Sequence, residues 1–424
     1  MHIILDNRGS LICNRVQYAK MSNNIFDIDI NAFAFGGAGV GKLPDGKVCF
    51  VRGAAPGERV SIEVTDDRSS FAYGKLLSVV RTVRTRITLE CPLAINGKDD
   101  GSCCPGCSYG HVDYETELAW KQRQLEGFLL RSGLTTRSRI RPPVAAPSRY
   151  GWRNKIRLTA EAGKVGYKGD DNTTVLDVPE CPLARRSINE ALAAYRAGEP
   201  AANASHLTFR WTLRDGVKIR PNTENPSDRF LCEQLGSHGD FFVPENSFFQ
   251  INVPMASKLA SATADRVKAG GAEFLLELFC GVGVLSISAA QKIDSLQVRG
   301  IELDKLAIKA AKLNASRHGL AGRCRYEAGD AEAQFQSFAR TMPADKTMIL
   351  VDPPRCGMSA GLCKKILAYK PKMLLYISCA PDTLRRDLEI LTKSGLYEVC
   401  DVQLFDLFPA TAHFETMTVL RRKV

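Results

Sequence analysis

The C-terminal part of the chain, from about Val253, alternates short apolar runs with longer amphipathic segments. A short unbroken apolar run is typical of a parallel strand whose two faces are both buried. Parallel strands need helical crossovers, so the alternation predicts a Rossmann-like α/β sheet of seven strands. Helices are expected between the first six strands, and the last two strands adjoin as a hairpin. The expected strands are Phe274–Phe279, Val298–Leu303, Cys324–Glu327, Thr347–Val351, Lys372–Ile377, Tyr397–Phe405 and Thr416–Arg421.

The ends of the first three strands predict a cofactor site. Seven strands ending in a hairpin describe a methyltransferase sheet better than a dehydrogenase sheet, which repeats a βαβ half. After the first strand, Gly281 and Gly283 let the backbone approach a ligand closely, and Glu302 at the end of the second strand is placed to accept hydrogen bonds from ribose hydroxyls. Leu285 and Ser286 replace the third glycine of an NAD fingerprint, which favours S-adenosylmethionine because this cofactor has no pyrophosphate. Asp330, after the third strand, is expected to reach the adenine.

The next two strand ends carry residues suited to chemistry. The fourth ends in Asp352-Pro-Pro-Arg355, where two prolines hold an Asp and an Arg on a rigid backbone that suits positioning a base or a cofactor. The fifth ends at Ser378-Cys379, and Pro381 opens a helix. Cys379 is a candidate nucleophile, since open α/β sheets bind ligands at this edge and a thiolate is reactive. The alternative is a small buried hydrophobe, the usual environment of a free cysteine.

Upstream, the pattern predicts two further units. From Ile25 to about Val83, short strands and turns suggest a small closed barrel, with residues 36–41 as a flexible turn. Through its Gly-x-Gly turn, Asp45-Gly-Lys47 and Pro56-Gly-Glu-Arg-Val60, this stretch resembles a TRAM domain, which implies an RNA-binding barrel of the OB type. The expected division is an N-terminal extension (1–22, with Met21 as an alternative start), the barrel (23–85), a mixed α+β central domain (86–252) and the methyltransferase domain (253–424).

Composition limits the partners and the compartment. A formal net charge of +11 over 424 residues favours a polyanionic partner, most simply nucleic acid. The start of the chain lacks the features of a signal peptide, and no apolar run reaches membrane-spanning length. Fourteen cysteines without a secretion signal indicate a reducing, cytoplasmic location. Nothing in the sequence requires a protein partner or more than a monomer.

Four cysteines in the central region are candidate ligands of a soft metal. Both zinc and an iron–sulfur cluster accept four cysteines, but a zinc ribbon normally uses two Cys-x-x-Cys knuckles and this chain has one. The spacing therefore favours a [4Fe–4S] cluster, with Cys103 as the rival for the second ligand. The expected ligands are Cys91, Cys104, Cys107 and Cys181.

A strongly basic segment follows. Between Trp120 and Arg157 there are ten Lys and Arg residues against one acid, Glu126, and the segment includes Tyr150 and Trp152. Arginines for phosphate and aromatics for stacking are typical of a path for single-stranded RNA. The alternative is a solvated face.

Together, these motifs resemble the RNA uracil-5-methyltransferase family over nearly the whole chain from about residue 25. Ala380 stands where the family often has Asn, and Val284 where it often has a polar residue. The markers are Trp152-Arg-Asn-Lys155, Phe249-Gln-Ile-Asn252, Phe279-Cys-Gly-Val-Gly283, Glu302, Asp352-Pro-Pro-Arg355, Ser378-Cys379 with Pro381, Thr383-Leu-Arg-Arg-Asp387, and Asp406-Leu-Phe-Pro-Ala-Thr-Ala-His413 with Glu415.

The resemblance implies a role for each marked residue. Cys379 is expected to be the nucleophile and Glu415 the general base, while Gln250, Phe279, Glu302 and Asp352 line the cofactor site. The cysteine group is similar to that of the cluster-bearing branch, which favours 23S ribosomal RNA as the substrate, although relatives act on transfer RNA.

The expected chemistry explains these residue types. Attack by Cys379 on carbon 6 of uracil turns the ring into an enolate, whose carbon 5 takes the methyl group; Glu415 then removes the carbon-5 proton. Arg355 is a hypothetical donor to the enolate oxygen. The target base must leave its stack to reach the site. The alternative from another class is a non-catalytic RNA-binding or ribosome-assembly protein that retains the fold.

Overall fold

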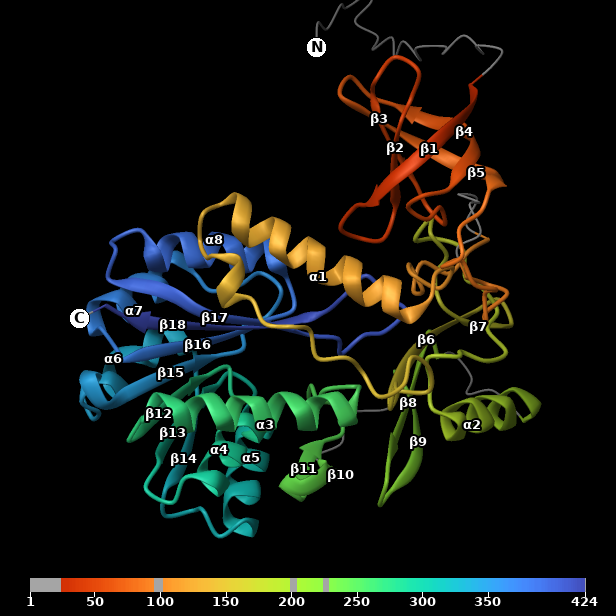
Figure 1. The fold of residues 1–424 in the computed structure, drawn as a ribbon. Helices are drawn as coiled ribbons and strands as arrows, with labels where there is room; N and C mark the ends of the chain where they lie inside the picture. The colour runs from red at the N-terminus through yellow and green to blue at the C-terminus, as the bar shows by residue number, and fades with distance from the viewer. Residues whose placement is uncertain (1–23, 95–101, 199–203, 224–228, 424) are drawn as a thin grey trace, which may run out of the picture.

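The computed structural model describes residues 24–94, 102–198, 204–223 and 229–423, so the predicted N-terminal extension lies outside the described residues. Near the N-terminus, five strands close into a barrel with the order β1-β2-β3-β5-β4 (Figure 1). Its core is apolar and includes Ile28, Val51 and Ile62. The strands are β1 (Ile25–Phe33), β2 (Gly39–Lys42), β3 (Val48–Val51), β4 (Arg59–Asp67) and β5 (Phe71–Arg81).

The prediction of a flexible turn over residues 36–41 is wrong in its second half, because β2 begins at Gly39. The glycines are needed there for close packing between strands. A Cβ atom on Gly39 would lie 2.7 Å from the carbonyl oxygen of Ala54, and one on Gly41 would lie 2.8 Å from that of Asp29. Such contacts exclude any larger residue.

The C-terminal region contains the predicted seven-stranded sheet, in the order β14-β13-β12-β15-β16-β18-β17. The first five strands along the chain are parallel, and β17 and β18 form the predicted antiparallel hairpin at one edge. The strands are β12 (Phe274–Leu278), β13 (Gln297–Glu302), β14 (Cys324–Ala328), β15 (Thr347–Val351), β16 (Met373–Ser378), β17 (Tyr397–Phe405) and β18 (Glu415–Arg422).

Helices cover both faces of this sheet, which explains why its central strands, β15 and β16 above all, are mostly apolar (Figure 1). One face packs against α3 (Val253–Gly270), α4 (Val284–Lys292) and α5 (Lys305–Arg317). The other packs against α6 (Ala331–Ala339), α7 (Ala360–Tyr369), α8 (Pro381–Thr392) and α1 (Tyr114–Arg131).

The central region provides α1 and two small antiparallel sheets. One sheet has the order β7-β6-β8-β9 and packs against α2 (Arg186–Ala197), and the other pairs β10 with β11. Across the described residues, no helix is long and apolar enough to span a membrane. The strands are β6 (Lys155–Glu161), β7 (Lys164–Gly166), β8 (His206–Thr212), β9 (Gly216–Pro221), β10 (Phe230–Gln234) and β11 (Asp240–Pro244).

The basic segment from Trp120 to Arg157 is partly tied to acidic residues of the same chain. Five of its ten cations form ion pairs within the chain, and several of these pairs join α1 and the segment after it to the C-terminal domain. These five cations therefore hold parts of the chain together, and the RNA path stays a prediction for the other cations of the segment. The pairs are Lys121 with Glu117 and Asp406, Arg137 with Glu126, Arg139 with Glu398, Arg141 with Asp401, and Arg149 with Glu117.

Candidate active site

A cavity of about 710 Å³ opens at the carboxyl edge of the parallel sheet. Its volume is typical of a small-molecule site, and its position is where open α/β sheets bind ligands. Each parallel strand contributes a residue from its carboxyl end or from the loop that follows. The predicted site residues in its wall are Gln250, Phe279, Gly281, Glu302, Asp330, Asp352, Arg355, Cys379 and Glu415.

The loop after β12 is held in a conformation that exposes its backbone to the cavity. Phe279 has a φ of 64°, which is unusual for a residue with a side chain and typical of strained functional loops. The Gly281 amide donates to the carboxylate of Glu302 at 3.1 Å, and the Asp304 amide donates to its other oxygen at 3.0 Å. Glu302 is thereby fixed at the end of β13, as binding of ribose hydroxyls would require.

Two predicted cofactor residues also have structural roles. Gly283 lies outside the cavity wall and begins α4 with a φ of 81°; a Cβ atom there would lie 3.0 Å from the Tyr326 hydroxyl. Asp330 is in the wall, but its carboxylate also caps α6 by accepting from the amide of Ala333 at 2.7 Å. The structure therefore explains Gly283 by conformation, whereas Asp330 remains able to reach a ligand.

The loop that carries Cys379 is rigid. The hydroxyl of Ser378 accepts from the Ala380 amide at 3.1 Å, and Pro381 starts α8 directly afterwards. Asp387 of α8 holds the neighbouring Asp352–Arg355 loop, because its carboxylate accepts from the amide of Met358 at 2.7 Å. The thiol and the Asp-Pro-Pro-Arg segment are thus fixed relative to each other.

Carboxylates dominate the electrostatics around the thiol. Burial, then Glu415 and Asp352, raise the pKa of Cys379 to about 11, and Arg355 opposes the shift. Burial and Asp352 raise the pKa of Glu415 well above its usual value, which Arg355 again opposes. The Oε2 atom of Glu415 is buried and has no hydrogen-bond partner among the described residues. The pocket thus holds a thiol, an unpaired carboxyl group and one guanidinium.

Arg355 also contacts His413. The two side chains approach to 3.3 Å between a guanidinium nitrogen and Nε2. Burial and the positive charge of Arg355 lower the pKa of His413 to about 4, so the imidazole is neutral at pH 7 and can accept from Arg355. This contact orients the guanidinium beside the Cys379 loop.

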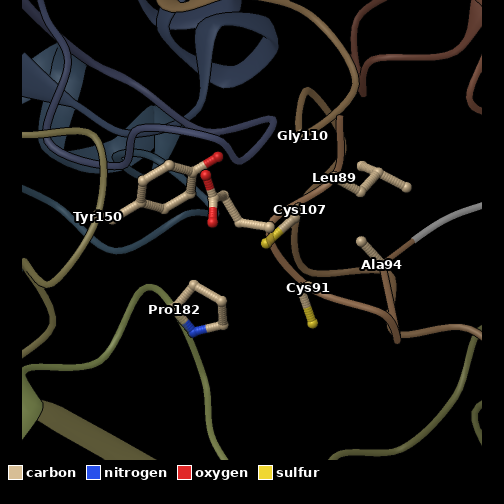
Figure 2. Close-up of a pocket in the computed structure, with 8 residues that line it drawn as sticks. Leu89, Cys91, Ala94, Cys107, Gly110, Tyr150 and Pro182 are labelled. Carbon is tan, nitrogen blue, oxygen red and sulfur yellow. The ribbon is translucent and has the colours of Figure 1, made fainter. Parts of the chain in front are cut away.

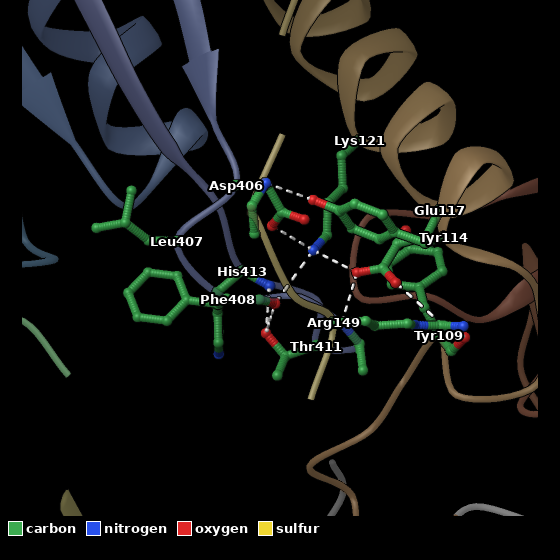
Figure 3. Close-up of polar contacts among 12 residues, drawn as sticks. Tyr109, Tyr114, Glu117, Lys121, Arg149, Asp406, Leu407, Phe408, Thr411 and His413 are labelled. Atoms are coloured by element: carbon green, nitrogen blue, oxygen red, sulfur yellow. Dashed lines mark hydrogen bonds and ion pairs between the residues drawn. The ribbon is translucent and has the colours of Figure 1, made fainter. Parts of the chain in front are cut away.

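A buried ionic network, shown in Figure 3, fixes the segment that leads to Glu415. Lys121 of α1 is fully buried and donates to Glu117 at 2.7 Å, to Asp406 at 2.8 Å and to the carbonyl of Phe408 at 3.2 Å. Glu117 in turn accepts from the amide of Ala410 at 2.7 Å. The Asp406–His413 marker is therefore a structural anchor for the loop before Glu415.

Sequence reasoning missed two contributors to the site. Glu277 lines the cavity and is buried, and burial raises its pKa to about 8. Its signal was a lone acid within the apolar run of the first strand. Lys121 was counted as an RNA-facing cation, and nothing in its local sequence shows that it is buried.

The four predicted metal ligands lie near enough for their thiols to influence one another. Burial raises the pKa of Cys107 to about 12, with added contributions from Cys181, Cys104 and Cys91. Cys103 differs, with its sulfur 3.9 Å from the hydroxyl of the adjacent Ser102.

The [4Fe–4S] prediction is nevertheless not supported. A cavity of about 10 Å³ lies beside Cys91 and Cys107 (Figure 2), but Cys104 and Cys181 are not in its wall, so it is not a space shared by the four predicted ligands. Within the described ranges, no group of three or more His, Cys, Asp or Glu side chains is arranged to hold a metal ion. No step below depends on a cluster.

The surplus of carboxylates gives a testable pH dependence. Because its pKa is raised, Cys379 is a thiol at pH 7, and its alkylation should accelerate about tenfold per pH unit up to about pH 11. A bound sulfonium cation should shift this profile to lower pH, since it offsets Asp352 and Glu415. Alkylation of the Cys379 peptide by iodoacetamide, followed by mass spectrometry, measures both effects.

S-Adenosylhomocysteine is the matched control, because it occupies the same space without the positive charge. It should protect Cys379 sterically as much as S-adenosylmethionine does but leave the pH profile in place. A profile that levels off below pH 8 in the free protein would contradict the assignment of a raised thiol pKa.

Comparison with known proteins agrees with this architecture. The model of the tRNA (uracil-5-)-methyltransferase family matches residues 236–423, and the TRAM domain model matches residues 19–77. An uncharacterised RNA methyltransferase of Halalkalibacterium halodurans is 28% identical, with coverage of 95% of this chain and 98% of the relative. The 23S rRNA (uracil(1939)-C(5))-methyltransferase RlmD of Acidithiobacillus ferrooxidans is 29% identical, with coverage of 91% and 95%.

A solved structure shares the whole fold. The tRNA (uracil-54, C5)-methyltransferase of Pyrococcus abyssi, in complex with S-adenosyl-L-homocysteine, has a TM-score of 0.69 at 21% identity. The match covers 93% of this chain and 99% of the Pyrococcus abyssi chain.

The seven-stranded sheet, with its cavity at the carboxyl edge and a terminal hairpin, defines a Rossmann-like methyltransferase preceded by a TRAM barrel. The fold class predicted from the sequence is confirmed. The C-terminal domain, over residues 236–423, is similar to the tRNA (uracil-5-)-methyltransferase family, and relatives that match nearly the whole chain are named RNA methyltransferases.

Proposed function

We propose that this enzyme methylates carbon 5 of a uridine in 23S ribosomal RNA through a covalent bond between Cys379 and carbon 6 of the uracil ring. The observation that carries the proposal is the shared cavity, in which Cys379, Glu415 and Arg355 face the same space as Gly281 and Glu302. The relative that is named as a 23S ribosomal RNA enzyme supports the choice of RNA. An RNA substrate and a cysteine-rich chain support a cytoplasmic location.

The cofactor would lie between the residues that line the inner cavity, with its ribose at Glu302 and its methionine part near Gln250 and Asp352. When bound, it supplies an electrophilic methyl group. The remaining chemistry belongs to the chain. The Cys379 thiol first loses its proton to solvent, which the bound sulfonium would favour because it offsets Asp352 and Glu415. The thiolate then attacks carbon 6, and the electrons of the carbon 5–carbon 6 double bond move towards the carbonyl oxygen at position 4, which becomes an enolate.

Arg355 is placed to donate to that oxygen, because its guanidinium lies in the cavity wall and is oriented by His413. Carbon 5 then attacks the methyl carbon, whose bond to the sulfonium sulfur breaks, so that S-adenosylhomocysteine is the leaving group. Glu415 accepts the proton of carbon 5, and the returning electron pair expels Cys379 as a thiolate. The raised pKa of Glu415 suits a base that must hold a proton after the step and release it to solvent once the product leaves.

Tritium release from uridine labelled at carbon 5 tests the proposal. Unmodified ribosomal RNA and unmodified transfer RNA are incubated separately with the protein and S-adenosylmethionine. We expect release from ribosomal RNA only, dependent on cofactor. Release from transfer RNA alone would correct the substrate and keep the chemistry, whereas methyl transfer without tritium release would contradict the reaction at carbon 5. Absence of methyl transfer to either RNA would favour the binding-protein alternative.

A further inference from the structure

One face of the sheet β7-β6-β8-β9 is apolar and covered, and the other is lined by cations. The apolar face includes Leu158, Leu207 and Phe209 and packs against α2. Residues directly opposite one another in antiparallel strands share a face. On the other face, Lys155 of β6 lies opposite Arg210 of β8, which lies opposite Lys218 of β9, and Arg157 lies opposite Thr208, which lies opposite Arg220.

Most of these charges are uncompensated. In the part of the chain that the structure describes, the side chains of Lys155, Arg157, Lys218 and Arg220 have no ion pair. Arg210 differs, because it is buried and pairs with Glu233 at 3.0 Å. The ion pairs of the segment before β6 join parts of the chain to one another, whereas these four cations have no anion of their own.

The lowered pKa of Lys155 reflects the positive charges gathered around it. Burial, followed by the positive charges of Arg210, Arg220 and Arg157, lowers it to about 8, and Glu233 offsets only part of the shift. Like charges held together on one face repel one another and destabilise the free protein. A bound polyanion would relieve this repulsion and raise the pKa of Lys155 again.

The face adjoins the active site. The backbone N–H of Asn154, the residue before β6, donates to the carbonyl of Ile251 at 2.9 Å. The guanidinium of Arg210 donates to the carbonyl of Glu245 at 3.2 Å. The segment between these two contacts carries Phe248, which is 74% exposed and lines the cavity. Figure 1 shows α2 on the outer side of this sheet, with α3 and the β10–β11 pair on its other side.

We propose that Lys155, Arg157, Lys218 and Arg220, called the cationic sheet face below, bind the phosphates of the RNA chain next to the target uridine. The proposal rests on the proposed function and adds the place where the substrate is held. Contacts of cations with phosphates fix position and register without reading sequence. The face would therefore grip the strand while the target base enters the cavity.

The test combines RNA affinity with its salt dependence. The variant carries Arg157→Gln and Arg220→Gln, which keep a polar side chain at each position and remove two positive charges from the face. Binding of unmodified ribosomal RNA fragments is measured at several salt concentrations. We expect the Kd to rise about tenfold and the log–log salt slope to fall by about 0.7 per lost phosphate contact. The KM for RNA should rise more than kcat falls.

Arg186→Gln is the matched control. Arg186 is 93% exposed on α2, on the covered side of the same sheet, and pairs only with Glu190. This variant loses one exposed arginine in the same domain, and both its Kd and its salt slope should stay at the wild-type values. Each single variant, Arg157→Gln or Arg220→Gln, should give an intermediate result, which keeps the test valid if the double variant does not fold.

The outcomes separate this proposal from the proposed function. Wild-type Kd and salt slope in the double variant, with methyl transfer intact, would overturn the cationic sheet face alone. If Arg186→Gln weakened RNA binding as much as Arg157→Gln or Arg220→Gln does, the proposal would also be overturned, because the effect would then come from net charge and not from this face. If the wild-type protein bound RNA but transferred no methyl group, the proposed function would be wrong. The salt dependence of RNA binding by the variants would still test the cationic sheet face. Binding of an acidic peptide in preference to RNA would assign the face to a protein partner.

Discussion

Replacing Cys379 with alanine should reduce methyl transfer to RNA by a factor on the order of 10⁴ or more, while binding of cofactor and RNA is retained. The physical reason is that carbon 5 of uracil is too weak a nucleophile until a covalent bond at carbon 6 makes the ring an enolate. Cys379 is the thiol in the cavity beside Glu415 and Arg355, so its removal should leave no route to that bond. Single-turnover transfer of labelled methyl groups gives the rate, and calorimetric titration with S-adenosylhomocysteine gives the cofactor affinity.

The matched control is Cys356→Ala. Cys356 is exposed and follows Arg355 in the same loop, but it is absent from the residues that line the cavity. Its loss should change the rate by no more than a few fold. If Cys379→Ala retained more than a few per cent of the wild-type rate, the covalent mechanism would be wrong, and equal losses in both variants would indicate a general effect of disturbing the site.

Glu415→Gln tests the covalent mechanism independently. The amide cannot accept the carbon-5 proton, so elimination should stop after methyl transfer. RNA should then stay attached to the protein through denaturing electrophoresis, and the attachment should require both Cys379 and S-adenosylmethionine.

The sheet and the edge that carries the site could be predicted because both depend on local sequence. A strand buried on two faces is a continuous apolar run, and its end is marked by the first polar or glycine residue. The ends of β12, β13, β15 and β16 were therefore visible, and with them Gly281, Glu302, Asp352 and Cys379. Parallel strands bring such ends together at one edge whatever the details of packing.

The features that depend on distant contacts could not be predicted. Gly39 and Gly41 suggested flexibility, because no local signal shows that the backbones of Ala54 and Asp29 lie against them. The four cysteines predicted a cluster from spacing alone, but ligand geometry depends on how Cys91, Cys104 and Cys107 pack against Cys181. Composition likewise assigned the basic segment to RNA, whereas its acidic partners come from other parts of the chain, including the last strands of the sheet.

Lys121 is the extreme case of this kind, since its partner Asp406 is 285 positions away along the sequence. Although burial alone would lower the pKa of Lys121, Glu117 and Asp406 raise it, so the amine is charged. We expect Lys121→Met to reduce the free energy of unfolding by about 3–5 kcal/mol, because the buried carboxylate of Asp406 would lose its pairing with Lys121 and that of Glu117 would keep Arg149 but lose Lys121. Urea unfolding followed by circular dichroism measures this change.

Two comparisons make the Lys121 result specific. Arg385→Ala removes a cation from an exposed pair with Glu389 in α8 and should change stability by less than about 0.5 kcal/mol. Adding Glu117→Gln and Asp406→Asn to Lys121→Met should recover part of the loss, because neutral groups need no counter-charge. Lys121 also holds the carbonyl of Phe408, in the segment that ends two residues before Glu415, so the single variant should lose methyl transfer beyond its loss of folded protein. A destabilisation below about 1 kcal/mol, or full activity in the folded fraction, would show that this segment is held by its apolar contacts instead.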